Sequence, residues 1–225
     1  MPPRAALWLV AACAAAAPAS AALSGREVRC LALIAYTEAA VDGVPGMTAV
    51  IRVVRNRMAD PRFPDDACAV IAQVAQFQPI AQSELLQKVA RDPEGYSIPQ
   101  VLGLRTPQSR ALLAAAHRLA RAAPAAADPT GGALYFVNPD YMDAEHCPWF
   151  ASLRRTAAIG GHVFMADHAP GEPIGSPALD CSRIGAAQAP ATDRSCSALR
   201  RGSPIAAPPW ACPDPPGRCC SQARP

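Results

Sequence analysis

The stretch that decides the fold is Cys30-Leu-Ala-Leu-Ile-Ala-Tyr-Thr-Glu-Ala39, a dense apolar run that contains a single carboxylate. Residues 27–40 include good helix formers and neither glycine nor proline, so the sequence predicts a central helix there. Leu31, Ile34 and Glu38 fall at i, i+3 and i+7, so the carboxylate shares a helix face with apolar side chains. Burial raises the pKa of a carboxyl, which suits a general acid near neutral pH. The alternative is a glutamate near a helix end whose carboxylate reaches solvent.

Four further helices are predicted, and proline- and glycine-rich turns separate several of them. They cover 47–59, 68–76, 82–91 and 106–123, and the turn before the first of them covers 42–46. Two short runs, 133–137 and 162–165, resemble strands and each follows a Gly-Gly pair, so they could pair as a small sheet. We therefore expect a mainly α (α+β) domain with a small β element.

The two ends of the chain differ in composition from this predicted domain, which occupies residues 26–166. Arg4, the apolar run 5–17 and the small residues 19–21 predict a signal peptide over 1–22 and hence export to the periplasm or the medium. Val10-Ala-Ala-Cys13 has the form of a lipobox, so a lipid anchor at Cys13 is one alternative, and an uncleaved buried helix is another. No second apolar segment approaches the length of a transmembrane helix. Residues 167–225 are rich in proline and cysteine, and we expect a poorly ordered tail.

Charge and cysteine content narrow the class of protein. The net charge of +3 is too small to predict nucleic-acid binding. Nine cysteines are present, and the eight that follow Cys13 form the even set expected of disulfides in an exported chain. Cys30 and Cys68 could join two predicted helices, a catalytic thiol being the alternative for Cys30, and Cys147 is expected to pair with a tail cysteine. No CxxC pair is present and no histidine lies at zinc spacing from a cysteine, so we expect no metal site and no cofactor.

Tyr36-Thr-Glu-Ala39 resembles the Tyr-x-Glu-Ala signature of the SleB-type cell wall hydrolases, the spore cortex-lytic enzyme family. Five further segments resemble motifs of that family and follow in its order, so that the resemblance covers about residues 30–165. They are Gly46 with 53–57, 61–71, Gln76-Phe77, 128–139 and 159–164. Where the family often has Gly-Glu, this chain has Val41-Asp42, so the loop after Glu38 departs from the family pattern.

The resemblance implies that Glu38 is the catalytic acid of an enzyme that cleaves peptidoglycan between N-acetylmuramic acid and N-acetylglucosamine. It also leads us to expect a lysozyme-like arrangement of helices. One acid suffices for a lytic transglycosylase, in which the muramyl C6 hydroxyl closes a ring, whereas paired-acid hydrolases need a second carboxylate to act on a water. The alternatives are a muramidase-type hydrolase and a non-catalytic cell-wall-binding disulfide protein. Peptidoglycan is the only partner that the resemblance implies, and the sequence does not determine the oligomeric state.

The resemblance also suggests residues that contact the sugar, for which amides and aromatic rings are suited. The candidate substrate-binding residues are Gln76, Phe77, Tyr135, Asn138 and His162. A structural role is the alternative, above all for His162. Asp42 could assist electrostatically or cap and solvate the turn that follows it. Arg57 could form a structural ion pair or contact the carboxylates of a peptide stem.

Overall fold

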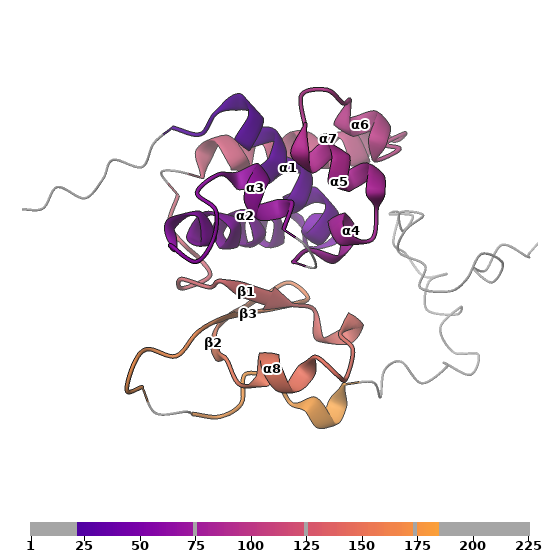
Figure 1. Cartoon of the computed structure of the whole chain (residues 1–225). Coiled ribbons are helices and arrows are strands. Elements are labelled where there is room, and N and C mark those ends of the chain that lie inside the picture. Colours follow the sequence, from indigo (N-terminus) through magenta and orange to yellow (C-terminus); the bar gives the residue numbers. More distant parts are fainter. Residues whose placement is uncertain (1–21, 74–75, 124–125, 173–174, 185–225) are drawn as a thin grey trace, which may run out of the picture.

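The structure, a computed structural model, describes residues 22–184 apart from 74–75, 124–125 and 173–174. The helices between residues 25 and 122 lie on one side of a three-stranded sheet, and one short helix lies on the other side (Figure 1). The prediction of a mainly helical domain with a small β element is therefore confirmed. Residues 1–21 of the predicted signal peptide, with Cys13, and the part of the predicted tail after Ile184 lie outside the described residues.

Helix α1 (Gly25–Ala39) runs through the centre of the helical part. A capping box starts it, in which Ser24 and Glu27 bond each other's backbone N–H groups. Residues 30–35 have no exposed surface because α2 (Gly43–Ala59), α3 (Ala67–Ile71) and α7 (Pro107–Ala122) surround them. The apolar run of the sequence is thus the core, and it places Glu38 at the C-terminal end of a helix that is buried on nearly all sides.

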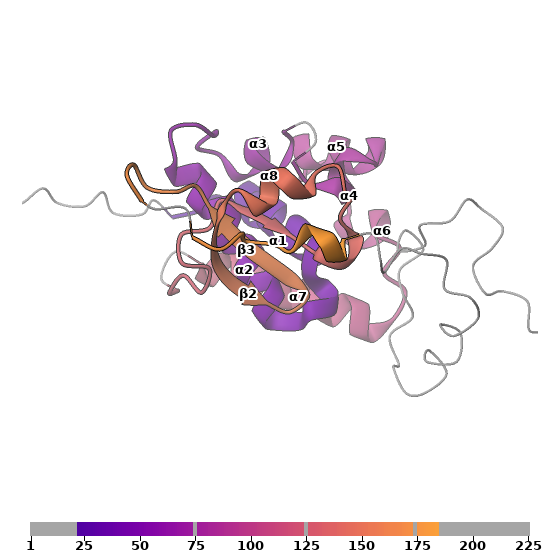
Figure 2. The same ribbon diagram turned by 90° about the horizontal axis from the view of Figure 1, so that it is seen from below.

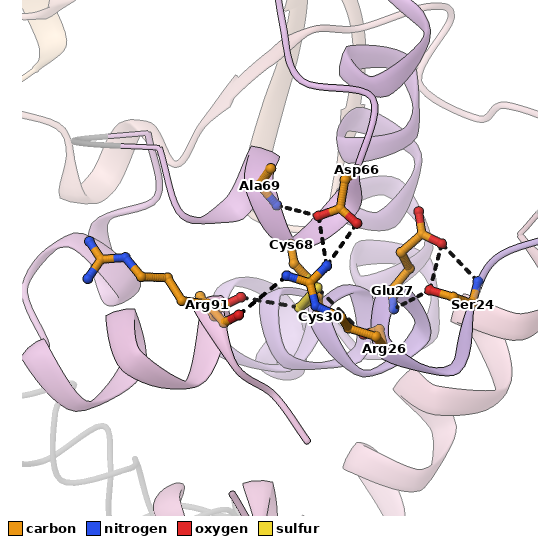
Figure 3. Close-up of polar contacts among 9 residues, drawn as sticks. Ser24, Arg26, Glu27, Cys30, Asp66, Cys68, Ala69 and Arg91 are labelled. Atoms are coloured by element: carbon orange, nitrogen blue, oxygen red, sulfur yellow. Dashed lines mark hydrogen bonds and ion pairs between the residues drawn. A yellow bond between two sulfur atoms is a disulfide. The ribbon is translucent and has the colours of Figure 1, made fainter. Parts of the chain in front are cut away.

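Shorter helices and a disulfide complete the helical part. They are α4 (Gln78–Ala81), α5 (Glu84–Arg91) and α6 (Ile98–Val101). The predicted disulfide between Cys30 and Cys68 is present and joins α1 to α3 (Figure 3). Beside it, Arg26 forms two hydrogen bonds to Asp66, whose side chain also caps α3 (Figure 3). The N-terminal half of α1 is therefore fixed by a covalent bond and by charged side chains.

Two of the predicted helix boundaries are wrong. The expected turn at 42–46 does not form, because a 3-10 turn, η1 (Ala40–Asp42), leads directly into α2 at Gly43. Pro45 is tolerated there, since the first N–H groups of a helix have no partner within the helix. The helix predicted over 68–76 ends at Ile71, and the chain turns so that Phe77 enters the core. Tertiary packing decides both boundaries.

The sheet contains strands β1 (Tyr135–Val137), β2 (Arg154–Ile159) and β3 (His162–Ala166) in the antiparallel order β1-β3-β2. The predicted pairing of the first and last strands is confirmed, with Phe136 opposite Phe164. Strand β2 was not predicted, because its sequence, Arg-Arg-Thr-Ala-Ala-Ile, does not alternate between apolar and polar residues; it becomes a strand by pairing with β3.

The two faces of the sheet pack against different partners. Phe136 and Phe164 face the helical part and contact Ala49 and Val53 of α2. The opposite face, which includes Met165, packs with Leu153 and the aromatic ring of Phe150 in α8 (Cys147–Ala151). Figure 2, seen from below, shows α8 lying across this face. The sheet is therefore a middle layer, and residues of β1 and β3 can reach the helical part.

The folded region extends beyond the predicted boundary at residue 166. Leu179 is buried with Met142 and Cys147, and Cys147 forms a disulfide with Cys181 at the start of η3 (Cys181–Arg183). The expectation that Cys147 pairs with a tail cysteine is thus confirmed, whereas the start of the tail was placed too early. In the described part of the chain, no helix is long and apolar enough to cross a membrane.

Candidate active site

Glu38 lies at the penultimate position of α1 and is half-buried as a residue. The oxygen Oε1 is buried, and no described residue offers it a hydrogen-bond partner. Burial raises the pKa of Glu38 to about 8, although the positive charge of Arg57 works in the opposite direction. Glu38 therefore holds its proton at neutral pH, as a general acid must.

Arg57 extends from α2 into a cluster of aromatic rings and is only 3% exposed. Its guanidinium carbon lies 5.0 Å from the ring centroid of Phe77, 5.2 Å from that of Phe63 and 5.9 Å from that of Tyr135. Its Nε donates a hydrogen bond of 2.7 Å to the carbonyl of Leu134. Burial lowers the pKa of Arg57 to about 10, so the side chain stays charged at neutral pH. The expected structural ion pair is not found, since no carboxylate among the described residues lies within ion-pair distance of Arg57.

Asp42 connects the corner after Glu38 to the turn between β2 and β3. Its Oδ2 lies 2.8 Å from Nδ1 of His162, and its Oδ1 accepts a hydrogen bond of 3.0 Å from the backbone N–H of Gly161. A Cβ atom at Gly160 would lie 2.3 Å from Cγ of Asp42, so only glycine allows this close approach. Asp42 therefore neither caps nor solvates the following turn. It holds the hairpin against the helical part, a role that sequence reasoning missed.

Of the residues predicted to contact sugar, two are largely covered by protein. Phe77 is 2% exposed, with its ring between Phe136 and Arg57, so it supports the arginine and presents no open face to a ligand. His162 is 6% exposed, bound to Asp42 and packed edge-on against Phe136. The structural alternative for His162 therefore describes its contacts, and direct sugar contact by these two residues stays a prediction.

The other three predicted residues keep surface for a ligand. Gln76 is exposed at the turn before α4. Tyr135 is partly exposed and lies edge-to-face with Trp149, at 5.1 Å between ring centroids. Asn138 is partly exposed, and its side chain caps the 3-10 turn η2 (Pro139–Tyr141). Only Tyr135 joins the cluster around Arg57, so these three remain predictions.

Trp149 is an aromatic side chain that the sequence reasoning passed over. It is 50% exposed on α8, where Tyr135 and Phe150 hold its ring by edge-to-face contacts. An exposed tryptophan within the short motif Pro148-Trp-Phe150 was the available signal. Among the described residues, no group of three or more histidine, cysteine, aspartate or glutamate side chains could hold a metal ion.

Comparison with known proteins places this site in a family. Residues 42–165, more than half of the chain, match the family model described as Cell Wall Hydrolase. The chain belongs to this cell wall hydrolase family. The resemblance inferred from its motifs is therefore confirmed. The matched range begins just after Glu38 and includes Asp42, Arg57 and His162.

Curated relatives of this cell wall hydrolase are spore cortex-lytic enzymes. The one from Halalkalibacterium halodurans is 28% identical over 144 residues, which are 64% of this chain and 36% of the relative. The one from Bacillus subtilis is 26% identical over 151 residues, which are 67% of this chain and 41% of the relative. The chain thus spans less than half the length of these two relatives.

Two solved structures are also similar to the cell wall hydrolase domain. One is the catalytic domain of the germination-specific lytic transglycosylase SleB from Bacillus anthracis, at 23% identity and a TM-score of 0.43, covering 64% of this chain and 96% of that one. The other is the catalytic domain of the Bacillus cereus SleB protein, with the same identity and TM-score and 92% of that chain covered.

Proposed function

We propose that this chain cleaves the glycan strand of peptidoglycan between N-acetylmuramic acid and N-acetylglucosamine by lytic transglycosylation. The observation that carries the proposal is Glu38, whose Oε1 is buried without a hydrogen-bond partner in the described structure and whose pKa is raised to about 8. A protonated acid in an apolar surrounding is the donor that a glycosidic oxygen requires. Membership of the cell wall hydrolase family supports the choice of substrate.

The reaction needs one acid that acts twice. Glu38 gives its proton to the glycosidic oxygen, the bond from that oxygen to C1 of the muramyl residue breaks, and N-acetylglucosamine leaves as an alcohol. The muramyl C6 hydroxyl then attacks C1, and its proton passes to the Glu38 carboxylate. The product carries a 1,6-anhydro ring, and Glu38 is protonated again and ready for the next cleavage.

The contacts of Asp42 favour this chemistry over hydrolysis. Hydrolases of the paired-acid type use a second carboxylate as base or nucleophile. Asp42, the acidic residue nearest to Glu38 in the sequence, has one oxygen on the N–H of Gly161 and the other on His162. It is therefore occupied in holding the hairpin. Muramidase-type hydrolysis is the second candidate within the same enzyme class.

The decisive experiment replaces Glu38 with glutamine and follows the clearing of a peptidoglycan suspension. We expect a loss of at least ~1000-fold, because the amide cannot donate a proton to the leaving oxygen. Glu27→Gln is the matched control, since Glu27 lies on the same helix in a capping box that glutamine also satisfies. If Glu38→Gln clears the suspension as fast as the parent, Glu38 is not the catalytic acid and the proposed mechanism is wrong. If neither form clears it, the chain is a wall-binding protein without this activity.

Mass spectrometry of the released muropeptides separates the two chemistries. Anhydro-muramyl ends are expected for transglycosylation, and reducing muramic ends would show hydrolysis. The substrate also requires export, which the predicted signal peptide would supply and which the two disulfides support. The mass of the mature N-terminus distinguishes cleavage near residue 22 from a lipid anchor at Cys13.

A further inference from the structure

The guanidinium of Arg57 is buried in an unusual way for a charged group. Burying a charge is costly unless it is paired or hydrogen-bonded. Arg57 is 3% exposed, yet its one hydrogen bond in the described structure runs from Nε to the Leu134 carbonyl. Its NH1 group is also buried, and no described residue accepts a hydrogen bond from it. The rings of Phe63, Phe77 and Tyr135 stabilise the cation through their faces and fix its position.

Arg57 therefore has a donor without an acceptor, Glu38 has an acceptor without a donor, and the two side chains interact electrostatically. Glu38 Oε1 is buried without a partner in the described structure, as is Arg57 NH1. The charge of Arg57 lowers the pKa of Glu38, and the charge of Glu38 raises the pKa of Arg57. Helices α1 and α2, which carry them, pack directly against each other. In a structural ion pair, Arg57 would donate a hydrogen bond to Glu38. In the described structure no such hydrogen bond forms between the protonated acid and the cation.

We propose that Arg57 is a positioning residue that stabilises the Glu38 carboxylate after Glu38 has given its proton to the substrate. In that interval Glu38 is an anion that must persist until the muramyl hydroxyl returns a proton. The charge of Arg57 acts on Glu38, and its NH1 has no hydrogen-bond acceptor in the described structure, so it stabilises the ionised state without stabilising the resting acid by a hydrogen bond. This inference rests on the proposed role of Glu38.

The other charged groups near Arg57 are already paired with each other. Arg62 forms ion pairs of 2.8 Å with Asp60 and with Asp167, and the charges of these three groups act on the pKa of Tyr135. Tyr135, in β1, raises the pKa of Arg57. On Glu38 itself the charge that acts is that of Arg57. Replacing Arg57 should therefore change the titration of Glu38 and leave the Asp60–Arg62–Asp167 group intact.

The test measures the pH profile of anhydro-muropeptide release for Arg57→Met, Arg57→Gln and Arg57→Lys. Activity falls at high pH as Glu38 loses its proton, and the charge of Arg57 lowers the pKa of Glu38. Without that charge the basic limb should move about one unit to higher pH, and kcat should fall ~10-fold or more because the anion is less stable. Arg57→Lys keeps the charge, so its limb should stay in place.

Each variant excludes a different objection. Arg57→Gln retains a donor for the Leu134 carbonyl, so it tests charge even if Arg57→Met fails to fold. A purely structural role would lower the melting temperature and leave the basic limb where it is. An unmoved limb in both neutral variants overturns the inference. The outcome with Glu38→Gln is separate: if that variant keeps its activity, the proposed function itself fails, whatever the Arg57 variants show.

Discussion

The two ends of helix α1 treat charge in opposite ways. At the N-terminal end, every charged side chain drawn in the close-up around Cys30 has a partner or lies at the surface (Figure 3). Ser24 and Glu27 form the capping box, and Arg26 pairs with Asp66. At the C-terminal end, Glu38 Oε1 is buried and has no hydrogen-bond partner among the described residues. The same holds for NH1 of Arg57 in α2, whose charge lowers the pKa of Glu38.

The N-terminal end of α1 is therefore fixed in the fold, whereas its C-terminal end carries the proposed catalytic acid. Partnered polar groups and a disulfide fix the first two turns, where nothing needs to react. In the last turn, Glu38 Oε1 is buried and has no hydrogen-bond partner among the described residues. Functional sites commonly break the rules of polar pairing that the rest of a fold obeys. The comparison predicts that changes at the C-terminal end alter activity and pH dependence, and that changes at the N-terminal end alter stability alone.

The largest effect on folding should come from removing the buried acid. Below its ordinary pKa of 4.5, Glu38 is protonated in both the folded and the unfolded state. Between that value and about 8, only the unfolded state loses the proton, so the free energy of unfolding falls as the pH rises, by several kcal/mol in all. Glu38→Gln should lack this loss, and urea denaturation at pH 5, 7 and 9 measures it. Profiles that stay parallel to the parent would contradict the buried acid, and Glu27→Gln is the control.

The next effect should come from the disulfide at the anchored end. The Cys30–Cys68 bridge closes a loop with a sequence separation of 38, so Cys30→Ala with Cys68→Ala should cost roughly 3–4 kcal/mol. Activity measured well below the melting temperature should be unchanged. Thermal denaturation measures the loss. The Cys147–Cys181 bridge, with a separation of 34, is the matched comparison, and a much smaller loss there would show that loop entropy does not decide the effect.

A smaller effect should follow from breaking the contact between the corner after Glu38 and the hairpin. Asp42→Ala leaves His162 and the N–H of Gly161 without this acceptor, which should cost roughly 2 kcal/mol of stability and reduce activity. Asp42→Asn can still accept from Gly161 and donate to His162, so it should lose less of both. Denaturation and muropeptide release are measured on the same preparations. Equal losses in the two variants would show that the charge of Asp42, and not its hydrogen bonds, holds the hairpin.

The smallest effect should come from the ion pair beside the disulfide. Asp66→Ala removes the cap of α3 and the partner of Arg26, which are partly exposed, so about 1 kcal/mol should be lost with no change in activity. Arg26→Met removes the pair and an exposed hydrogen bond to the Arg91 carbonyl but keeps the cap, so it should cost less. Both are measured by denaturation. A drop in activity for either variant at full folding would show that the anchored end also controls the site.

Much of the site could be predicted from the sequence because its signals are local. The apolar run 30–35 and the i, i+3, i+7 spacing placed Glu38 on an apolar helix face, and the order of the motifs indicated the family and made Glu38 the candidate acid. The contacts of Arg57 and Asp42 could not be predicted, because their partners are far along the chain. Arg57 bonds Leu134, at a separation of 77 residues, and Asp42 contacts His162, at a separation of 120 residues. Phe77 shows the same limit: its type suggested a sugar contact, and only the packed structure shows that Arg57 and Phe136 cover it.

The sequence by itself therefore predicted the central helix with its one carboxylate and the pairing of β1 with β3, and it offered the Cys30–Cys68 bridge as one possibility. Helical periodicity and glycine pairs are properties of short segments, and cysteines can be counted directly. These signals can therefore be read without knowledge of the fold. Only the tertiary structure decided strand β2, the start of α2, the packing of Leu179 against Met142 and Cys147, and the environment that raises the pKa of Glu38 to about 8. Burial, the absence of a partner in the described structure and the nearby charge of Arg57 arise when distant segments meet, because desolvation depends on everything that surrounds a group.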